Sequence, residues 1–318
     1  MDHDGGYHLL FSHPQMVADL LRGFVSEPWA ARLDLSTLER VNAKFHADGL
    51  ERRDGDVIWR VRTLDGEYAY LYIVLEFQSS PDHWMAVRVM VYVGLLYLHL
   101  IREKLVDPNR PLPPVFPVVF YNGKDEWRKA RDVGELVGLA PDGTPWAWRP
   151  RMQYHLLDEL RYNTTDVNGG SDNVVAILIE MEQCRTVEEL HSRVTRVVEL
   201  LSGEENASLR RAFTSWLTTV LGPARGLNLR RTDVTELSEV RDVLAERVRE
   251  WEQGWYEQGR VKGEALALIR LIERRFGPLP SEMRDQIMAA DAATIEGWLD
   301  RLMDAPNLSA VFDDRPTS

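Results

Sequence analysis

The sequence predicts an α/β protein whose first half holds a small mixed sheet flanked by helices and whose second half is all helical. Two apolar segments, Val57–Thr63 and Tyr68–Phe77, are separated by a short turn, which indicates a β-hairpin. A further apolar run, Pro114–Gly123, ends in Asn-Gly, which is typical of a buried strand followed by a turn. From about Ser171 onward, apolar residues recur at helical spacing.

Helices and one further strand complete the first half. Tyr7–Val25 has apolar residues at helical spacing, with Ser12 as a possible cap and Pro14 in the first turn. Met85–Lys104 is predicted to be a long amphipathic helix. Met152–Leu160 is predicted to be a short strand or an edge of the sheet.

The second half is predicted to be a succession of helices. Its longest segment is strongly charged and contains Gly259 and Gly263. Their spacing suits either close approach of another helix or a hinge, since glycine inside a helix costs about 1 kcal/mol. The expected helices are Asn173–Gln183, Thr186–Leu201, Glu204–Leu221, Glu236–Gly277, Ser281–Ala290 and Ala293–Asp304.

These patterns divide the chain into three regions. We expect an α/β domain over residues 1–165, a helical extension over 171–235 and a C-terminal helical domain over 236–312. The long charged helix of the last region offers charges of both signs along its length, as helices that mediate interactions do. The C-terminal helices are therefore candidates for homo-oligomer formation or partner binding.

The composition is that of a soluble globular protein. Of 318 residues, 44% are apolar and 28% charged, and the net charge is −12. This charge argues against a broadly basic nucleic-acid binder, although an enzyme with a local basic groove remains compatible with it. One cysteine, Cys184, excludes an internal disulfide framework and fits a reducing compartment. The apolar run Ala86–Ile101 is interrupted by Arg88 and is short for a membrane span, so we expect a cytoplasmic protein without a membrane segment.

Polar side chains close the second strand of the hairpin. Glu76 and Gln78 end the apolar run and share one face of the strand. Burial there disfavours a charged carboxylate unless something compensates the charge. Asp54 and Asp56 share a face in the same way at the start of the first strand. Whether the two pairs meet depends on the turn between the strands.

The turn leaves two registers open. A two-residue loop places Gly55 opposite Glu76, so that Asp56 lies on the other face. A three-residue loop centred on Gly66 places Asp56 opposite Glu76. In that register the two carboxylates have Cβ atoms about 5 Å apart, which is destabilising unless a cation lies between them. Mg²⁺ would suit such a pair, because it binds one or two carboxylates and completes its coordination with water and substrate phosphate oxygens.

Several blocks together resemble a known family. "GDVIWRV", "YIVLEFQSSPDHWMAVRVMVY", "FPVVFYNGKDEW" and "QYHLLDE" occur in the order found in the Rpn family of recombination-promoting nucleases, a transposase-like family within the PD-(D/E)XK superfamily. The resemblance covers about Tyr7–Leu160. It implies a restriction-endonuclease-like core, metal-dependent cleavage of DNA and a role linked to recombination or mobile elements. "GRVKGEALALIRLIERRFGPLP" is similar to a C-terminal domain of unknown function that often follows such a core.

The resemblance assigns roles to the residues of the hairpin. It implies that Asp56 and Glu76 hold Mg²⁺ or Mn²⁺, with Asp54 as the alternative to Asp56. Gln78 stands where much of the superfamily has lysine. A glutamine cannot place a positive charge beside the phosphate, but it can orient the attacking water by hydrogen bonds.

The helix after the hairpin contributes a cation. Arg88 and Tyr92 match an Arg-x-x-x-Tyr pattern of the family. Arg88 could bind a substrate phosphate and supply the positive charge that Gln78 lacks. The other interpretation is a salt bridge from Arg88 to Glu76 or Asp82.

Two further interpretations remain open at this point. The chain could be a catalytically inactive, nuclease-like scaffold whose helical regions make the functional contacts, which the net charge and Gln78 favour. Trp146 and Trp148, in "TPWAWRP", could stack on nucleic-acid bases, although packing in the core or on the surface is the commoner use of such residues.

Overall fold

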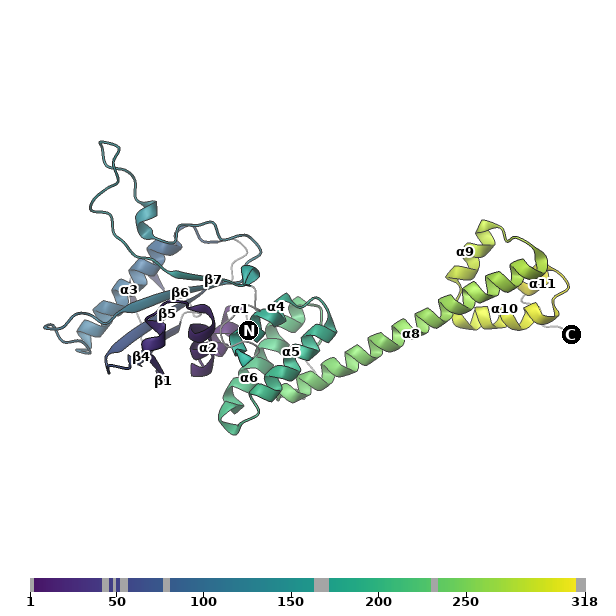
Figure 1. The fold of residues 1–318 in the computed structure, drawn as a ribbon, viewed down its shortest axis with the longest axis horizontal. Helices are drawn as coiled ribbons and strands as arrows, with labels where there is room; N and C mark the ends of the chain where they lie inside the picture. Colours follow the sequence, from purple (N-terminus) through teal and green to yellow (C-terminus); the bar gives the residue numbers. More distant parts are fainter. Residues whose placement is uncertain are drawn as a thin grey trace. The chain divides into compact units, whose positions relative to one another are not determined.

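We describe a computed structural model of the chain. It describes residues 3–41, 46–47, 50–51, 57–76, 81–162, 172–229 and 234–312. Within these ranges the chain forms two compact units, residues 1–244 and 245–318. Figure 1 shows the elements of each unit.

A mixed sheet of five strands forms the first unit's framework, with the order β1-β4-β5-β6-β7. The antiparallel part holds β1, β4 and β5, and β5, β6 and β7 are parallel. A small separate sheet pairs two short strands, β2 and β3. The strands are β1 (Leu33–Arg40), β2 (His46–Ala47), β3 (Leu50–Glu51), β4 (Val57–Thr63), β5 (Tyr68–Glu76), β6 (Val115–Tyr121) and β7 (His155–Asp158).

The α/β class and the mixed sheet agree with the prediction, and β4 has the predicted bounds. The predicted strand over Met152–Leu160 is β7, which lies at an edge of the sheet. The sequence analysis missed β1. Its residues are mostly half-buried or exposed, because it is the opposite edge strand and carries polar side chains.

The register of the β4–β5 hairpin differs from both expected registers. Those registers would place Val74 or Leu75 opposite Val57, whereas Val57 pairs with Ile73. The loop has three residues but begins one residue earlier than expected, at Leu64. The backbone N–H of Thr63 donates to the carbonyl of Glu67 at 2.7 Å and closes it. Gly66, the last loop residue, has φ +86°, a left-handed conformation that glycine adopts without strain.

Alternation along the strands sends side chains to two cores. Val57 and Trp59 of β4 face a core shared with α1 (His3–Leu10) and α2 (Pro14–Phe24). Ile58 faces the other core, which is covered by α3. The segment Tyr7–Val25 forms two helices, and the predicted one, with Pro14 in its first turn, is α2. Pro14 begins α2 as predicted, but Ser12 does not cap it, because the Ser12 hydroxyl donates to the His8 carbonyl at 2.6 Å.

The helix α3 (Met85–Arg102) lies along the sheet (Figure 1). By length and composition alone it is the one helix among the described residues that could cross a membrane. One face of it is buried in the core, as the sequence predicts. Residues on that face include Val89, Val93 and Leu96. Two of its other residues, Leu98 and Ile101, are exposed.

Helices of the extension complete the first core. Asn173 caps α4, because its side-chain oxygen accepts a hydrogen bond from the N–H of Ala176 at 3.0 Å. The same side chain donates to the carbonyl of Asp19 on α2 at 2.7 Å. The helices are α4 (Val174–Gln183), α5 (Val187–Leu200), α6 (Ala207–Trp216) and α7 (Gly222–Ala224), with a π-helical segment at Leu217–Leu221 before α7.

Short 3-10 segments join these elements: η1 (Ala30–Arg32), η2 (Val133–Leu136), η3 (Glu159–Arg161) and η6 (Glu204–Asn206).

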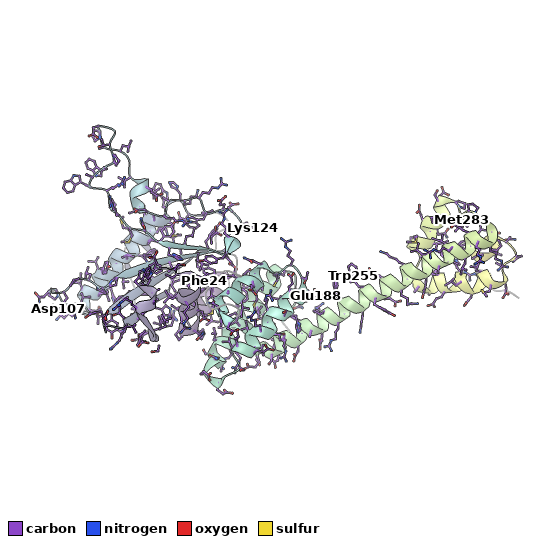
Figure 2. All side chains as sticks on the ribbon, viewed as in Figure 1. Phe24, Asp107, Lys124, Glu188, Trp255 and Met283 are labelled. Carbon is purple, nitrogen blue, oxygen red and sulfur yellow. The ribbon has the colours of Figure 1, made fainter. Side chains whose placement is uncertain are left out.

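The core under the sheet includes residues from both regions that the sequence separates at 165–171. Phe24 on α2 and Ile177 on α4 belong to the same buried cluster. Figure 2 shows the side chain of Phe24 within this unit.

The first unit ends inside the long helix α8 (Leu237–Phe276), after Leu244. Leu237 and Leu244 pack into the first core, so the division lies later than the expected boundary at 235. The helix α8 continues through Gly259 and Gly263 without a break. A Cβ at either glycine would meet no described atom of this chain within 4 Å.

The second unit packs three short helices on the end of α8. They are α9 (Ser281–Ala289), α10 (Ala292–Asp304) and α11 (Leu308–Phe312), of which the sequence analysis did not predict α11. Its core includes Leu268, Ile295 and Trp298. Arg275 secures the end of α10, donating to the carbonyls of Met303 and Ala305 at 2.9 Å each. Met283 on α9 and Trp255 on α8 are labelled in Figure 2.

Candidate active site

The parallel strands of the sheet end side by side. Glu76, the last residue of β5, pairs with Tyr121, the last residue of β6. Tyr121 in turn pairs with Asp158, the last residue of β7. Because ligands of α/β proteins bind beyond the carboxyl ends of parallel strands, this edge is the candidate site. We call it the carboxyl edge, defined by Glu76, Tyr121, Asn122, Asp158 and Glu159.

Glu159 is the most unusual group at the carboxyl edge. It begins η3 directly after β7, and only 1% of it is exposed. Neither of its carboxyl oxygens has a hydrogen-bond partner among the described residues. Burial raises its pKa well above the usual value, and the negative charges of Glu182 and Asp158 raise it further. The group is therefore held toward its neutral, protonated form.

A hydrogen-bonded chain lies beside Glu159. The Tyr7 hydroxyl, on α1, donates to the carboxylate of Glu182 on α4. Asn122, which follows β6, donates through Nδ2 to the Tyr7 oxygen at 3.3 Å. Burial, followed by the charges of Glu159 and Glu182, raises the pKa of Tyr7 well above its usual value, so the phenol stays protonated. This chain joins the N-terminal helix, the sheet and the helical extension at one place.

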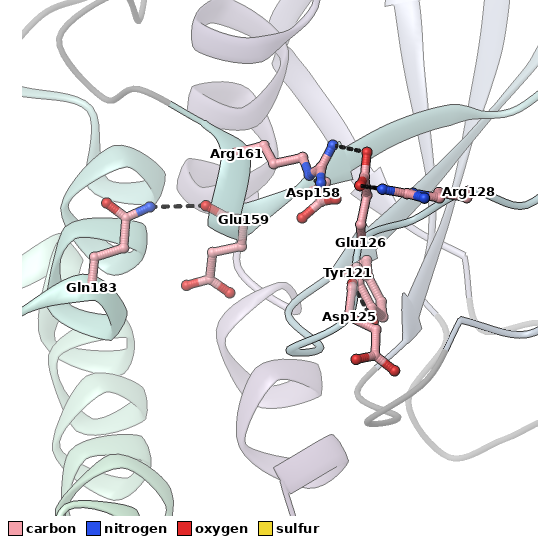
Figure 3. Close-up of polar contacts among 8 residues, drawn as sticks. All are labelled: Tyr121, Asp125, Glu126, Arg128, Asp158, Glu159, Arg161 and Gln183. Atoms are coloured by element: carbon pink, nitrogen blue, oxygen red, sulfur yellow. Dashed lines mark hydrogen bonds and ion pairs between the residues drawn. The ribbon is translucent and has the colours of Figure 1, made fainter.

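Gln183 ties the same helix to the end of β7. Its Nε2 donates to the backbone carbonyl of Glu159 at 2.9 Å, as Figure 3 shows. The contact fixes the backbone of Glu159 and leaves its carboxyl group unused. In its protonated form, which the raised pKa favours, the Glu159 carboxyl group can donate one hydrogen bond.

Arginines surround the outer carboxylates. Arg161 lies 3.4 Å from Asp158, measured from Nε to Oδ2, and donates to Glu126 at 2.6 Å. Arg128 donates to the other oxygen of Glu126 at 2.5 Å. Hydrogen bonds from Arg161 and Arg128 lower the pKa of Glu126 to about 2. Glu126 therefore stays ionised between two cations (Figure 3).

Arg88 lies near the start of α3 and is paired. Its Nη1 is 2.8 Å from Oδ2 of Asp82, and both side chains are mostly buried. This is the salt bridge to Asp82 that the sequence left open. Tyr92, one turn later, is 4% exposed, and its ring lies 5.8 Å from that of Tyr72 on β5.

The predicted metal ligands are described only in part. Asp56 and Gln78, and the alternative Asp54, lie outside the described residues. For Glu76, the structure gives its backbone position at the end of β5. Among the described side chains, no group of three or more His, Cys, Asp or Glu residues could hold a metal ion. The acidic character of the edge fits a hard cation such as Mg²⁺, which prefers oxygen ligands.

Sequence reasoning missed most of the buried polar groups. Asp158 and Glu159 had a signal, since "HLLDE" closes an apolar strand with carboxylates just as "IVLE" does. Tyr7 and Glu182 had none, because they are 175 residues apart and meet only through packing.

Comparison with known proteins places these features in a family. A family model described as putative transposase, YhgA-like, matches residues 1–210. Recombination-promoting nuclease RpnD of Escherichia coli O157:H7 is 32% identical over 122 residues, covering 38% of this chain and 45% of that protein. RpnA of Escherichia coli strain K12, another recombination-promoting nuclease, is 31% identical over 121 residues, covering 38% of this chain and 40% of that protein.

A third relative carries a different description. The inactive recombination-promoting nuclease-like protein RpnE of Escherichia coli strain K12 is 32% identical over 123 residues, covering 38% of this chain and 39% of that protein. The matched segment thus spans less than half the length of each of these relatives. No solved structure matches the chain.

Proposed function

The chain belongs to the YhgA-like putative transposase family, and from this premise we propose that it is a metal-dependent DNA endonuclease that hydrolyses phosphodiester bonds. Relatives named recombination-promoting nucleases support the nuclease chemistry and a role in recombination or mobile-element movement. DNA is the partner that such an activity requires. We further propose a cytoplasmic location, supported by the single cysteine.

We propose that the core has the PD-(D/E)XK fold. The order of elements supports this assignment: an antiparallel hairpin of β4 and β5 is followed by α3 and then by β6, parallel to β5. This is the order that the resemblance implies, with the predicted acidic strand at the centre of the sheet.

The observation that carries the proposal is the position of Glu76. It ends the central strand, in register with the ends of β6 and β7, where Asp158 and Glu159 follow. A carboxylate at this edge can hold a cation next to a substrate bound across the strand ends. The net charge of −12 does not attract DNA, so a bound cation would have to bridge substrate and protein.

Each predicted site residue then has a task. Asp56 and Glu76 would hold Mg²⁺ or Mn²⁺, an ion that stabilises charge on the phosphate and lowers the pKa of water. Gln78 would orient the attacking water. Arg88 would bind the phosphate, since its guanidinium group is planar and matches the geometry of phosphate oxygens.

Plasmid nicking tests the proposal. Wild-type protein is expected to nick supercoiled DNA with Mg²⁺ or Mn²⁺ and to be inert with EDTA. Asp56→Ala and Glu76→Ala should each lower the rate by about 100-fold or more, because metal ligands contribute several kcal/mol to such reactions. Glu204→Ala, an exposed carboxylate on η6, is the matched control and should cut normally. Cleavage that persists in both site variants would exclude this site.

One observation favours a second function, a catalytically inactive scaffold. Relatives of similar identity are described as inactive, and Gln78 replaces the superfamily lysine. Thermal unfolding separates the two functions. The nuclease is expected to gain melting temperature with Mg²⁺ or Mn²⁺, by preferential binding to the native state, and Glu76→Ala should lose that gain. A scaffold without a metal site would show no gain in either protein.

We also propose that the C-terminal helices mediate self-association. The support is a pair of exposed aromatic side chains on α8: Trp251 is 54% and Trp255 62% exposed, with ring centroids 5.2 Å apart. Light scattering on the full chain measures the mass directly. A monomer at all concentrations, or an oligomer unchanged by replacing both tryptophans with alanine, would refute this role.

A further inference from the structure

We propose that the loop at residues 137–153, here called the tryptophan loop, binds DNA by stacking an unpaired base on Trp148 while Arg149 and Arg151 contact neighbouring phosphates. The inference rests on the proposed nuclease function and specifies its substrate: a DNA strand with exposed bases, as found in single-stranded or frayed DNA. The loop connects η2 with β7, and Figure 1 shows it extending away from the sheet at the top left of the view.

The tip of the tryptophan loop is ordered by its own hydrogen bonds. The N–H of Ala140 donates to the carbonyl of Thr144 at 2.8 Å. Asp142 accepts from the N–H and hydroxyl of Thr144 at 3.0 and 2.6 Å. Gly143 has φ +81°, which a tight turn requires here. The hairpin directly precedes Trp148, and the N–H of Arg149 donates to the carbonyl of Trp146 at 3.2 Å, so the backbone on both sides of Trp148 is held by hydrogen bonds, which reduces the entropy lost on binding.

Trp148 is unusually exposed. It is 84% accessible, and Trp146 is 41% accessible, whereas Trp216 and Trp127 are buried in the two cores. No fold-stabilising contact accounts for an indole in water, since stabilisation by an aromatic side chain comes from its burial. An indole this exposed can stack on a base, and such stacking tolerates any base sequence.

The arginines beside it are available for phosphates. Among the described residues, the guanidinium groups of Arg149 and Arg151 make no hydrogen bond or salt bridge, in contrast with those of Arg88 and Arg161, although the charge of Arg151 helps to lower the pKa of Asp132. Both line a hollow of about 140 Å³ at the base of the loop, together with Asp132, Gly134, Glu135 and Gln153. One of the two carboxylates there is already engaged: Asp132 accepts hydrogen bonds from Gly134 and Gln153 at 2.7 and 3.1 Å.

The combination selects nucleic acid over other partners. A stacking aromatic ring within three residues of two unpaired guanidinium groups matches one base and its flanking phosphates. In a duplex the faces of internal bases are covered by their neighbours, so Trp148 can reach them only where the strand is unpaired or frayed.

The test measures binding separately from cleavage. Full-length protein is titrated into a fluorescein-labelled single-stranded oligonucleotide and into its duplex, in EDTA, with fluorescence anisotropy as readout. Wild type is expected to prefer the single strand. Trp148→Ala should weaken that binding about tenfold, and Trp148→Phe should restore most of it. The double variant Arg149→Ala/Arg151→Ala should also weaken binding to the single strand. Because two phosphate contacts are lost, the slope of log Kd against log salt concentration should fall by roughly 1.4.

Controls make the outcomes distinct. Leu64→Ala, which removes a 67% exposed apolar side chain from the hairpin loop between β4 and β5, should bind like wild type. Equal binding by wild type and Trp148→Ala would refute the role of the tryptophan loop in DNA binding. It would not refute the proposed nuclease activity, which plasmid nicking measures separately. If the wild type bound the duplex more tightly than the single strand, the proposed specificity for unpaired bases would be refuted. A wild type that binds no single-stranded DNA in EDTA would overturn the inference, whereas plasmid nicking with Mg²⁺ or Mn²⁺ decides the proposed nuclease function separately.

Discussion

At the residue scale, surroundings decide the charge of each carboxyl group near the strand ends. Glu126 lies between two arginines, which lower its pKa to about 2 and keep it ionised. Glu159 is buried among other acidic groups, which raises its pKa and favours the neutral acid. The two residues are both glutamates near the same edge, but their surroundings shift their pKa values in opposite directions.

The buried state of Glu159 predicts a pH dependence of stability. Its usual pKa is 4.5, and the pKa in the folded protein is higher. Between these two values the folded state binds more protons than the unfolded state, so the stability of the wild type falls as pH rises through this window. Glutamine cannot ionise. Glu159→Gln should therefore match the wild type near pH 4 and exceed it at pH 8, by about 1.4 kcal/mol per unit of pKa shift.

Urea unfolding at a series of pH values measures this difference. Glu204→Gln, which changes an exposed carboxylate, should give a difference that does not grow with pH. If the advantage of Glu159→Gln were the same at every pH, the Glu159 carboxyl group would not be the source of the effect.

At the element scale, α4 is attached to α2 through buried polar contacts. Asp19 is only 4% exposed, and its side chain accepts a hydrogen bond from the N–H of Val174 at 3.0 Å. Asn173 caps α4 and also donates to the Asp19 carbonyl. The helical extension is thereby positioned so that Glu182, at the other end of α4, reaches Tyr7. The geometry of the carboxyl edge depends on this attachment.

Asn173→Ala is expected to destabilise the first unit by about 2–4 kcal/mol. The change removes a helix cap, worth about 1 kcal/mol, and leaves a buried carbonyl without its donor, which costs about 1–3 kcal/mol. Thr186→Ala is the matched control. Thr186 caps α5 by accepting from Glu189 at 3.2 Å at an exposed site, so its loss should cost only about 1 kcal/mol. Equal losses in chemical denaturation would contradict the attachment role of Asn173.

At the scale of the whole molecule, the first core needs the helical extension. Trp216 on α6 is fully buried, and its ring centroid lies 5.8 Å from that of Tyr7. Leu237 and Leu244, from the first turns of α8, close the same core. A protein cut before α4 would expose these apolar contacts to water, at about 25 cal/mol per Å² of apolar surface.

Truncation tests this division. Residues 1–244 are expected to unfold in one cooperative transition and to keep the near-ultraviolet circular dichroism of packed tryptophans. Residues 1–165, the domain that the sequence suggests, should instead be aggregation-prone or lack such a transition, because their share of the core is exposed. A cooperative 1–165 fragment as stable as 1–244 would show that the extension is dispensable for folding.

The sequence by itself determined the local elements. The spacing of apolar residues predicted β4, β5, β6, α3 and α8 to within a few residues, because each of these elements has a clear apolar pattern in its own sequence. It also placed Glu76 at the end of a buried strand. The edge strand β1 was not predicted, because a half-exposed strand with many polar residues shows no clear alternation of apolar residues.

Tertiary structure decided what lies next to what. The hairpin register depends on which residues close the loop, and a shift of one residue reverses the face of every side chain. The pairing of Tyr7 with Glu182 and the burial of Glu159 arise from helices far apart in sequence that share one core. Local sequence carries no information about such long-range packing, and the pKa values and polar contacts of the candidate site follow from it.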